Sequence, residues 1–371
     1  MTQPLKLFII AGARPNFMKV APLMKAITLH NGSPGGRPRI VDTLIHTGQH
    51  YDEKMSDVFF RELGIRQPDL NLGVGSGSHA VQTATTMISF AAACEKDRPD
   101  WVVVVGDVNS TVACTLVSSK MGIKVAHVEA GLRSFDRTMP EELNRLVVDV
   151  LADLLLTPSE DGNENLQREG IHASKVRLVG NIMIDSLIEN LEKSRAHPIL
   201  KNHGLEPGRF AYVTLHRPAN VDNRASLTSI MQELTRVAKE LPVVFPIHPR
   251  TRKMLQEFGA LPEGGQGMVL LEPVGYHESL CLTENARLVL TDSGGLQEEA
   301  TYFRTPCLTL RPNTERPITI RLGSNRLTDV DRLRGDVEQA LKGPARIGEV
   351  PPFWDGRTAQ RTLDAILAAS A

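Results

Sequence analysis

The chain has 371 residues, of which 41% are hydrophobic and 23% are charged, and its formal net charge is -1 at pH 7. This charge balance gives no electrostatic reason to expect nucleic acid or an acidic membrane as a partner. The length exceeds that of a comfortable single core, so we expect two domains.

No basic stretch followed by an apolar one marks the N-terminus, and the longest apolar runs, such as WVVVV at 101–105, have strand length rather than membrane length. We therefore expect a cytoplasmic protein without a membrane partner. The four cysteines lie far apart and form no CxxC pair, so the sequence indicates neither a zinc site nor a disulfide framework. We expect all four to be buried packing residues: Cys94, Cys114, Cys281 and Cys307.

Strand-like and helical runs alternate from residue 6 to about residue 156. The strand-like runs are LFIIAG, IVDTLIH, WVVVVG, KVAHVEA and DLLLTP, and helices are predicted over 15–29, 52–63 and 79–95. This order predicts a parallel sheet with helices on both faces, on which ligands bind beyond the carboxyl ends of the strands. The run GVGSG at 73–77 has glycines like those of a nucleotide loop, but we expect no strand before it and read it as a surface loop.

The same rhythm restarts at Ala211 with the strand-like runs AYVTL, VVFPIH, MVLLEP and ARLVL. The fold class is therefore predicted to be α/β, with two Rossmann-like, doubly wound parallel-sheet domains. We expect the first domain to cover 1–187 and to be completed by a C-terminal helix within 355–371, and the second to cover 188–354.

The stretch TDSGGLQEEA at 291–300 follows a strand and opens a helix. Amides at a helix start, with glycines that permit close approach, form an anion site, so Ser293, Gly294 and Gly295 are candidates to bind a phosphate. Glu298 or Glu299 could accept the hydroxyl pair of a ribose. The alternative is a serine N-cap with a tight turn.

Two cations stand at the predicted start of the first helix, in GARPNFMK. Pro15 suits the first helical position, Arg14 precedes it and Lys19 lies one turn inside. Cations oppose the dipole at a helix start, which favours a ligand-binding role, although both could be surface residues with buried stems.

Carboxylates follow the strands of the first half. Asp107 and Glu129 each come just after an apolar strand, where desolvation would raise a carboxyl pKa and suit a general acid or base. Glu141 begins a helix, and Arg145 lies four residues on, at the spacing of an ion pair. That pair could instead serve only the helix start.

Histidines and arginines follow the strands of the second half. His216 and Arg217 come after one strand, and His248 and Arg250 after the next. A single such histidine would more often be a packing residue, but two in equivalent positions are expected to converge on the SGG turn. Arg316 is a further cation, and together these cations would surround a diphosphate.

No constellation indicates a metal. Asp329 and Asp331 form a DxD pattern, but they precede a predicted helix and are interpreted as a helix cap.

Nine motifs occur in an order that resembles one known family, the non-hydrolysing UDP-N-acetylglucosamine 2-epimerases. The motifs are GARPNFMK, TGQH, GDVNST, HVEAGLRS, PEELNR, GNIMID, TLHRPANVD, HPRT and TDSGGLQEEA, and the resemblance runs from about residue 6 to residue 320. The resemblance implies the B-type glycosyltransferase fold, with two domains facing a central cleft, a UDP-sugar held mainly by the second domain, and a homodimer.

The resemblance also implies roles for single residues. Ser293, Gly294 and Gly295 would bind the diphosphate, and Glu299 the ribose. The remaining candidates are Arg14, His216 and Arg316 near the diphosphate, Asp107, Glu129 and Glu141 as acid/base groups, and Lys19 and Arg145 in support of them.

The implied reaction inverts C2 of the sugar without a redox cofactor, through loss of UDP to a 2-acetamidoglucal and its re-addition, and it would supply polysaccharide synthesis. Departures from the family pattern are Asn16 and Ala219, where many relatives have Glu. Gln49 and His50 match a second-substrate activator site, but GVGSGSH lacks its arginine. A hydrolysing relative, an epimerase of a modified sugar, a B-type glycosyltransferase and a non-catalytic sensor remain alternatives.

Overall fold

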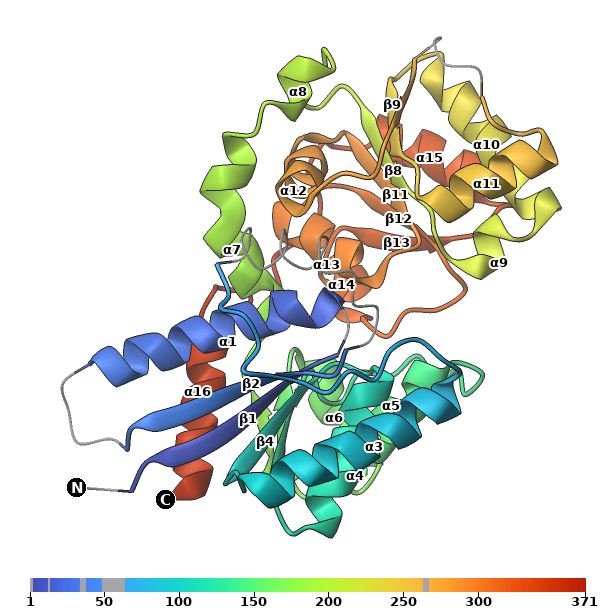
Figure 1. The fold of residues 1–371 in the computed structure, drawn as a ribbon. Coiled ribbons are helices and arrows are strands. Elements are labelled where there is room, and N and C mark those ends of the chain that lie inside the picture. Colours follow the sequence, from blue (N-terminus) through green and yellow to red (C-terminus); the bar gives the residue numbers. More distant parts are fainter. Residues whose placement is uncertain (1–2, 13, 34–37, 49–63, 263–266) are drawn as a thin grey trace. The chain divides into compact units, whose positions relative to one another are not determined.

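The computed structural model describes residues 3–12, 14–33, 38–48, 64–262 and 267–371. The chain divides into two compact units, one formed by Met1–Ser186 with Pro352–Ala371 and the other by Leu187–Pro351. Each unit is a parallel sheet with helices packed on both faces (Figure 1). The predicted fold class, two Rossmann-like parallel-sheet domains, is therefore confirmed.

The first unit contains a parallel sheet in the order β3-β2-β1-β4-β5-β6-β7. Its strands among the described residues are β1 Leu5–Ala11, β2 Ile40–His46, β3 Leu70–Asn71, β4 Trp101–Val105, β5 Lys124–Val128, β6 Leu154–Thr157 and β7 Val176–Leu178. The chain moves outward in one direction from β1 to β3 and then in the other from β4. The carboxyl ends of β1 and β4 therefore flank the place where ligands bind in such sheets.

The short strand β3 corrects one expectation about the glycine-rich run at 73–77. We predicted no strand before that run. The structure has one, because β3 lies just before the run in the sequence and pairs with the end of β2. The helix predicted over 52–63 lies outside the described residues.

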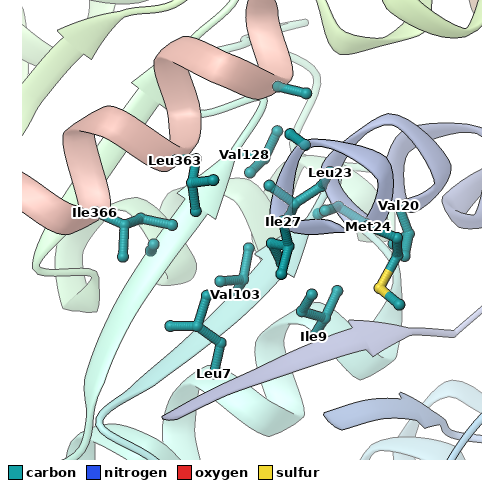
Figure 2. Packing of buried hydrophobic residues seen from close by; sticks show 14 of the residues in the cluster. Leu7, Ile9, Val20, Leu23, Met24, Ile27, Val103, Val128, Leu363 and Ile366 are labelled. Atoms are coloured by element: carbon teal, nitrogen blue, oxygen red, sulfur yellow. The ribbon is translucent and has the colours of Figure 1, made fainter. Parts of the chain in front are cut away.

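The first unit buries its sheet between two layers of helices, because successive strand residues point to opposite faces. Leu7 and Ile9 of β1 pack with α1 and α16 on one face (Figure 2), whereas Phe8 and Ile10 pack on the opposite face. The helices are α1 Arg14–Gly32, α3 His79–Lys96, α4 Asn109–Lys120, α5 Pro140–Leu151, α6 Glu160–Arg168, the short 3-10 helix η1 Ala173–Lys175, and α16 Thr358–Ser370.

Helix α16 comes from the far end of the chain and completes the first unit. The carboxylate of Asp185 accepts hydrogen bonds from the backbone N–H groups of Thr358 and Ala359, at 3.1 and 2.7 Å, and so caps the start of α16. Near its other end, Trp101 Nε1 donates to Ser370 Oγ at 2.8 Å. The C-terminal helix predicted from the apolar spacing is confirmed.

Helix α1 contains a proline, and a hydroxyl far away in the sequence supplies the hydrogen bond that the proline cannot make. Pro22 has no N–H group, so it cannot donate to the carbonyl of Met18 four residues earlier. The hydroxyl of Ser186, the last residue of the first unit before the chain crosses, donates to that carbonyl instead.

The second unit repeats the same sheet order, β10-β9-β8-β11-β12-β13, again with parallel pairing. Its strands are β8 Ala211–Thr214, β9 Val243–Pro246, β10 Met268–Leu271, β11 Leu288–Thr291, β12 Cys307–Leu310 and β13 Asn325–Thr328. The direction of the connections reverses between β8 and β11, which places the expected ligand position at the carboxyl ends of these two strands.

Helices cover both faces of the second sheet (Figure 1). Val213 faces one core cluster and Tyr212 the other. The helices are α8 Ile199–Asn202, α9 Pro218–Val221, α10 Arg224–Ala238, α11 Pro249–Phe258, α12 Tyr276–Asn285, α13 Gly294–Phe303, α14 Ile318–Arg321 and α15 Leu333–Lys342, and α7 Ile182–Arg195 carries the chain from the first unit into the second.

All four cysteines are buried and unpaired in disulfides, as predicted. Among the described residues, no helix is both long and apolar enough to cross a membrane.

Candidate active site

The first unit places a buried ion pair at the carboxyl ends of its strands. The Lys19 ammonium, one turn into α1, forms a salt bridge with the carboxylate of Glu129, which follows β5. The two residues are only 8% and 4% exposed. Glu129 has a backbone φ of 70°, in a region that non-glycine residues rarely adopt, so its orientation is held by its surroundings.

Gly106 lies against this ion pair. A Cβ atom at Gly106 would stand 2.8 Å from Lys19 Nζ and 3.4 Å from a carboxylate oxygen of Glu129. Its φ of 66° also favours glycine. The turn after β4 can therefore approach Lys19 only because it has no side chain at this position.

Asn16 joins the turn after β1 to the end of β4. Its side-chain oxygen accepts from the Gly12 N–H at 3.0 Å, and its amide donates to the carbonyl of Val105 at 3.2 Å. Asn16 is 2% exposed, so the residue that replaces the Glu of many relatives is a bridge inside the site.

Asp107 and Arg145 form a second ion pair near the end of β4, with Arg145 Nη1 placed 2.5 Å from Asp107 Oδ2. The other carboxylate on Arg145 is that of Glu142, at 2.6 Å. The predicted i, i+4 pair between Glu141 and Arg145 is therefore wrong. Arg145 reaches the residue three positions earlier, because both spacings lie on the same helix face.

Glu142 was missed by the sequence analysis, and it is a structural anchor. Its carboxylate accepts hydrogen bonds from the N–H groups of Ser134 and Phe135, at 2.9 and 2.8 Å, in addition to those from Arg145. Burial alone would raise the pKa of Glu142, but the Ser134 amide and Arg145 outweigh it and lower that pKa. Glu141 is half-buried at the start of α5, beside this anchor.

The SGG turn of the second unit begins α13 as predicted. Ser293 occupies the N-cap position, yet its hydroxyl makes no capping hydrogen bond to the helix. A Cβ atom at Gly294 would lie 2.9 Å from Arg316 Nη1, so this glycine permits the arginine to approach the helix start. At Gly295, apart from its chain neighbours and the backbone of α13 itself, no atom of the described residues lies within 4 Å of such a Cβ position, which leaves room at the helix start.

The positive charge of Arg316 is balanced by two carboxylates, so this arginine is not part of a cluster made of cations alone. Its Nε lies 2.7 Å from Glu298, and its Nη1 pairs with Glu315. Glu315 also accepts from Arg311 at 2.9 Å. Burial would raise the pKa of Glu315, but the charges of Arg316 and Arg311 hold it well below its usual range.

Glu299 is one of two buried carboxyls of α13, beside Glu298. Burial, together with the neighbouring charge of Glu298, raises the pKa of Glu299 to about 8. The phenol oxygen of Tyr276 is also buried, and the charge of Glu299 adds to the burial that raises the tyrosine pKa. A carboxyl in such surroundings gains from hydroxyl donors supplied by a ligand.

His216 contacts the residue that precedes the SGG turn, as the predicted convergence requires. Its Nδ1 lies 2.9 Å from Oδ1 of Asp292, a fully buried residue that the sequence analysis did not select. The same carboxylate accepts from the Arg217 N–H at 2.9 Å and from Asn220 Nδ2 at 3.1 Å. Asp292 thereby fixes the turn after β8 to the end of β11.

His248 and Arg250 do not take part in this arrangement. The His248 ring accepts from the Arg250 N–H and caps α11, and the Arg250 guanidinium pairs with Asp222. Among the described residues neither His248 nor Arg250 forms a hydrogen bond or ion pair with the SGG turn, and β8 lies between β9 and β11 in the sheet.

Asp329 accepts from the Arg332 N–H at 2.9 Å and pairs with its guanidinium at 2.7 Å. It therefore caps the turn before α15, whereas the N-cap position of the helix itself is Arg332, without a side-chain capping bond. Within the described ranges, no group of three or more His, Cys, Asp or Glu residues is placed to hold a metal. The side chain of Arg14, and Gln49 and His50, lie outside the described part of the structure.

The family model described as UDP-N-acetylglucosamine 2-epimerase matches residues 36–367. A UDP-N-acetylglucosamine 2-epimerase of Methanococcus maripaludis is 41% identical over 95% of this chain and 96% of its own length. A UDP-2,3-diacetamido-2,3-dideoxy-D-glucuronate 2-epimerase of Pseudomonas aeruginosa is 39% identical over 88% of this chain and 89% of its own.

A solved structure of the Methanocaldococcus jannaschii UDP-GlcNAc 2-epimerase, in complex with UDP-GlcNAc and UDP, is similar in fold. It superposes with a TM-score of 0.87 at 40% identity, over 98% of this chain and all of the other. The matched length and the identity show that the chain belongs to the UDP-N-acetylglucosamine 2-epimerase family.

Proposed function

We propose that the chain catalyses the reversible epimerisation of UDP-N-acetylglucosamine to UDP-N-acetylmannosamine, without net hydrolysis. The observation that carries this proposal is the pair of carboxylates, Glu129 with Lys19 and Asp107 with Arg145, after the neighbouring strands β5 and β4. Inversion at C2 needs groups that remove and return a proton, and two carboxylates meet that need.

In the proposed reaction one carboxylate takes the C2 proton while the bond from C1 to the UDP oxygen breaks. The products of this step are a 2-acetamidoglucal and UDP, and the electron pair leaves with the diphosphate. UDP then adds back to C1 while a proton is delivered to the opposite face of C2. Atoms and charge balance without an oxidant or a cofactor. Glu129, which forms the salt bridge with Lys19 after β5, is a candidate base, with Asp107 and Glu141 as the other acid/base candidates.

The second unit would hold the nucleotide. Amides at the start of α13, the Ser293 hydroxyl and Arg316 would bind the diphosphate and stabilise its charge as it departs. Since Nδ1 of His216 is engaged by Asp292, its Nε2 is the nitrogen left for the ligand. Glu299 would accept the ribose hydroxyls, and Arg14 would contact the diphosphate from α1.

Proton NMR of the purified protein with UDP-N-acetylglucosamine in deuterated water tests this proposal. Growth of a UDP-N-acetylmannosamine signal with deuterium at C2 is the expected result. Release of N-acetylmannosamine and UDP would assign the chain to the hydrolysing class. Absence of exchange and product, with UDP binding intact, would refute epimerase activity on this substrate, and addition of sugar acceptors would then test for a transferase.

A modified UDP-sugar is the second candidate substrate. The identity of 39% to the Pseudomonas aeruginosa relative, which is named for a diacetamido uronate, is almost equal to the 41% found for the Methanococcus maripaludis relative. Competition between the two UDP-sugars in one reaction would rank them by kcat/KM. A preference of tenfold or more for the uronate would replace the substrate proposed above.

We also propose that the enzyme is a cytoplasmic homodimer that supplies cell-surface polysaccharide synthesis. Helix α5 supports self-association, because Leu143, Val147 and Val150 form an apolar row at helical spacing and are 42%, 39% and 60% exposed. Light scattering coupled to size-exclusion chromatography would test the dimer, and a monomer at micromolar concentration would refute it.

A further inference from the structure

Four charged side chains form a buried network next to the turn that carries Glu129. His127 Nδ1 lies 2.6 Å from Asp149 Oδ1, and Arg133 Nη1 lies 2.7 Å from the other oxygen of Asp149. Arg133 also donates two hydrogen bonds to Glu169, at 2.7 and 2.6 Å. The side chains of His127, Arg133 and Asp149 are fully buried, and that of Glu169 is 26% exposed.

The histidine faces an acceptor on each side. Its Nε2 lies 2.9 Å from the carbonyl oxygen of Gly106, opposite the Asp149 contact. Both ring nitrogens must then donate, which requires the doubly protonated imidazolium. Two cations and two carboxylates balance in the network, and burial alone would raise the pKa of Asp149, but His127 and Arg133 hold it below its ordinary value.

One end of the network holds the turn after β5. The second oxygen of Asp149 accepts from the Gly131 N–H at 3.0 Å, and Asn165 Nδ2 donates to the Gly131 carbonyl at 2.9 Å. The N–H of Glu129 donates to the carbonyl of Leu156 at 3.1 Å. These bonds keep the left-handed backbone of Glu129 in place, since a non-glycine residue adopts it only when its neighbours impose it.

The other end of the network holds the turn after β4. Besides the bond from His127 to its carbonyl, Gly106 donates its N–H to the carbonyl of Val128 at 3.1 Å. Gly106 is the residue that packs against Lys19 Nζ. His127 thus connects the two turns that bound the Lys19–Glu129 pair.

We propose that His127, Asp149 and Arg133 are positioning residues that fix Glu129 relative to Lys19 by locking the turns after β5 and β4. Apolar side chains of similar volume could stabilise a core at least as well as a buried ionic group, so a purely structural role gives no reason for these four charges. Hydrogen bonds are directional, so charged side chains can fix the orientation of the two turns, which apolar side chains cannot do. The proposal rests on the proposed role of Glu129, and it goes further by assigning a function to three residues that touch no reacting atom.

Asp149→Asn is the principal test. The asparagine keeps the shape and can still accept from Arg133 and Gly131, but it loses the ionic contact that orients the ring of His127. Misplacement of a reacting group by about 1 Å can lower turnover by about 100-fold, so we expect kcat to fall by about 10- to 100-fold. KM, and the Kd for UDP measured by calorimetry, should stay within about threefold, because the nucleotide would be held by the other unit.

A pair of histidine variants separates the two contacts. Gln at 127 can keep a donor near the Nε2 position, for Gly106, and Asn can keep one near the Nδ1 position, for Asp149. We expect both H127Q and H127N to lower kcat, since each breaks one of the two links. Should the core substitutions fail to fold, E169Q at the partly exposed end is the milder variant, and its expected loss in kcat is about two- to fivefold.

Asp336→Asn in the second unit is the matched control. Asp336 is also a buried carboxylate, and it accepts from Thr328 Oγ1 at 2.7 Å, outside the proposed active site. D336N should destabilise the fold without a specific change in kcat. Equal losses of kcat, UDP affinity and stability in D149N would mean a general structural role and overturn the proposal.

Glu129→Gln distinguishes failure of this inference from failure of the proposed function. If E129Q is folded and turns over normally, the role of Glu129 is wrong, and the positioning role falls with it. If E129Q is inactive while folded D149N, H127N, H127Q and E169Q all keep the wild-type kcat, only the positioning role is wrong. Ring nitrogen chemical shifts of His127 in labelled protein should report the imidazolium, and a neutral ring would contradict the assigned geometry.

Discussion

The Nδ1 atom of His216 lies 2.9 Å from Oδ1 of Asp292, so the ends of two neighbouring strands are joined beside the SGG turn. Asp292 is fully buried, and burial would raise its pKa. Hydrogen bonds and charge from His216, with the bonds from Arg217 and Asn220, lower that pKa instead. The carboxylate is therefore held ionised at the position where the nucleotide is proposed to bind.

Asp292→Asn should weaken UDP binding. The substitution removes the charge that orients His216 and the turn after β8, and we expect Kd to rise by about tenfold, or about 1.4 kcal/mol. Calorimetric titration with UDP is the measurement. Asp222→Asn is the control, because the Asp222 carboxylate pairs with Arg250 and forms no bond with Asp292 or the SGG turn among the described residues, and the Kd of this variant should be unchanged. Equal affinities of D292N and the wild type would remove Asp292 from the nucleotide site.

Glu129→Gln and Glu142→Gln should fail in different ways. We expect E129Q to lower kcat by about 100-fold or more while the protein stays folded, because a general base is lost. E142Q removes the charge from a carboxylate that accepts from Ser134, Phe135 and Arg145, and it should cost about 3 kcal/mol of unfolding free energy. Steady-state kinetics and urea unfolding measure the two effects. A stable, fully active E142Q would show that the anchor is dispensable.

The buried carboxyl of Glu299 predicts a pH dependence of stability. Its pKa is about 8 in the folded chain, against an ordinary value of 4.5. Between these values the folded state binds a proton that the unfolded state has lost, so stability from this group falls as pH rises above about 4.5 and is lost fully as pH passes about 8. Relative to Glu299→Gln, the wild type should lose melting temperature over this window. Parallel curves for the two proteins would contradict the raised pKa.

The affinity for UDP should also depend on the ionisation of Glu299, but it should increase with pH over the range in which the stability falls. If ribose hydroxyls donate to ionised Glu299, UDP binding favours loss of the proton, and affinity should increase as pH rises towards about 8. Calorimetry in buffers of different ionisation enthalpy should detect proton release in the wild type and none in E299Q. Proton release of equal size in both proteins would assign the effect to another group.

Gly106→Ala should damage the reaction more than the fold. The added Cβ would lie 2.8 Å from Lys19 Nζ and should displace the ammonium from Glu129. Gly122→Ala is the matched control, since Gly122 has a φ of 64° and Gly106 a φ of 66°. A Cβ atom added at Gly122 would meet only Arg98, at 3.8 Å. Both substitutions should lower the free energy of unfolding by about 1 to 2 kcal/mol, because alanine disfavours the left-handed backbone, but only G106A should lower kcat. Equal kcat values would show that Gly106 matters only for its backbone.

Ser186→Ala and Pro22→Ala should compensate for each other. Loss of the Ser186 hydroxyl leaves the Met18 carbonyl without its donor, at a cost of about 1 to 3 kcal/mol. Alanine at position 22 would restore the helical N–H that can donate to Met18. Chemical unfolding of the two single variants and the double variant forms a cycle. Additive losses in the double variant would show that the two positions do not share this carbonyl.

The sequence by itself determined the alternation of most strands and helices and the residues that end the longer strands, but it missed the short strands β3, β7 and β13. The predicted features are local, because strands and helices have fixed side-chain periods and glycine-rich turns favour particular positions. The start of α13 at Gly294 and the place of Lys19 within α1 were predicted on that basis. The family motifs added proposed roles to these positions, but not their contacts.

Only the tertiary structure decided which charged groups meet. On α5 both Glu141 and Glu142 were within reach of Arg145, and the turn at Ser134 selected Glu142 by donating its N–H to that carboxylate. Asp149 pairs with His127 across 22 residues, and Asp292 with His216 across 76. Such partners depend on which strands become neighbours, and that is set by long-range packing rather than by any pattern along the chain.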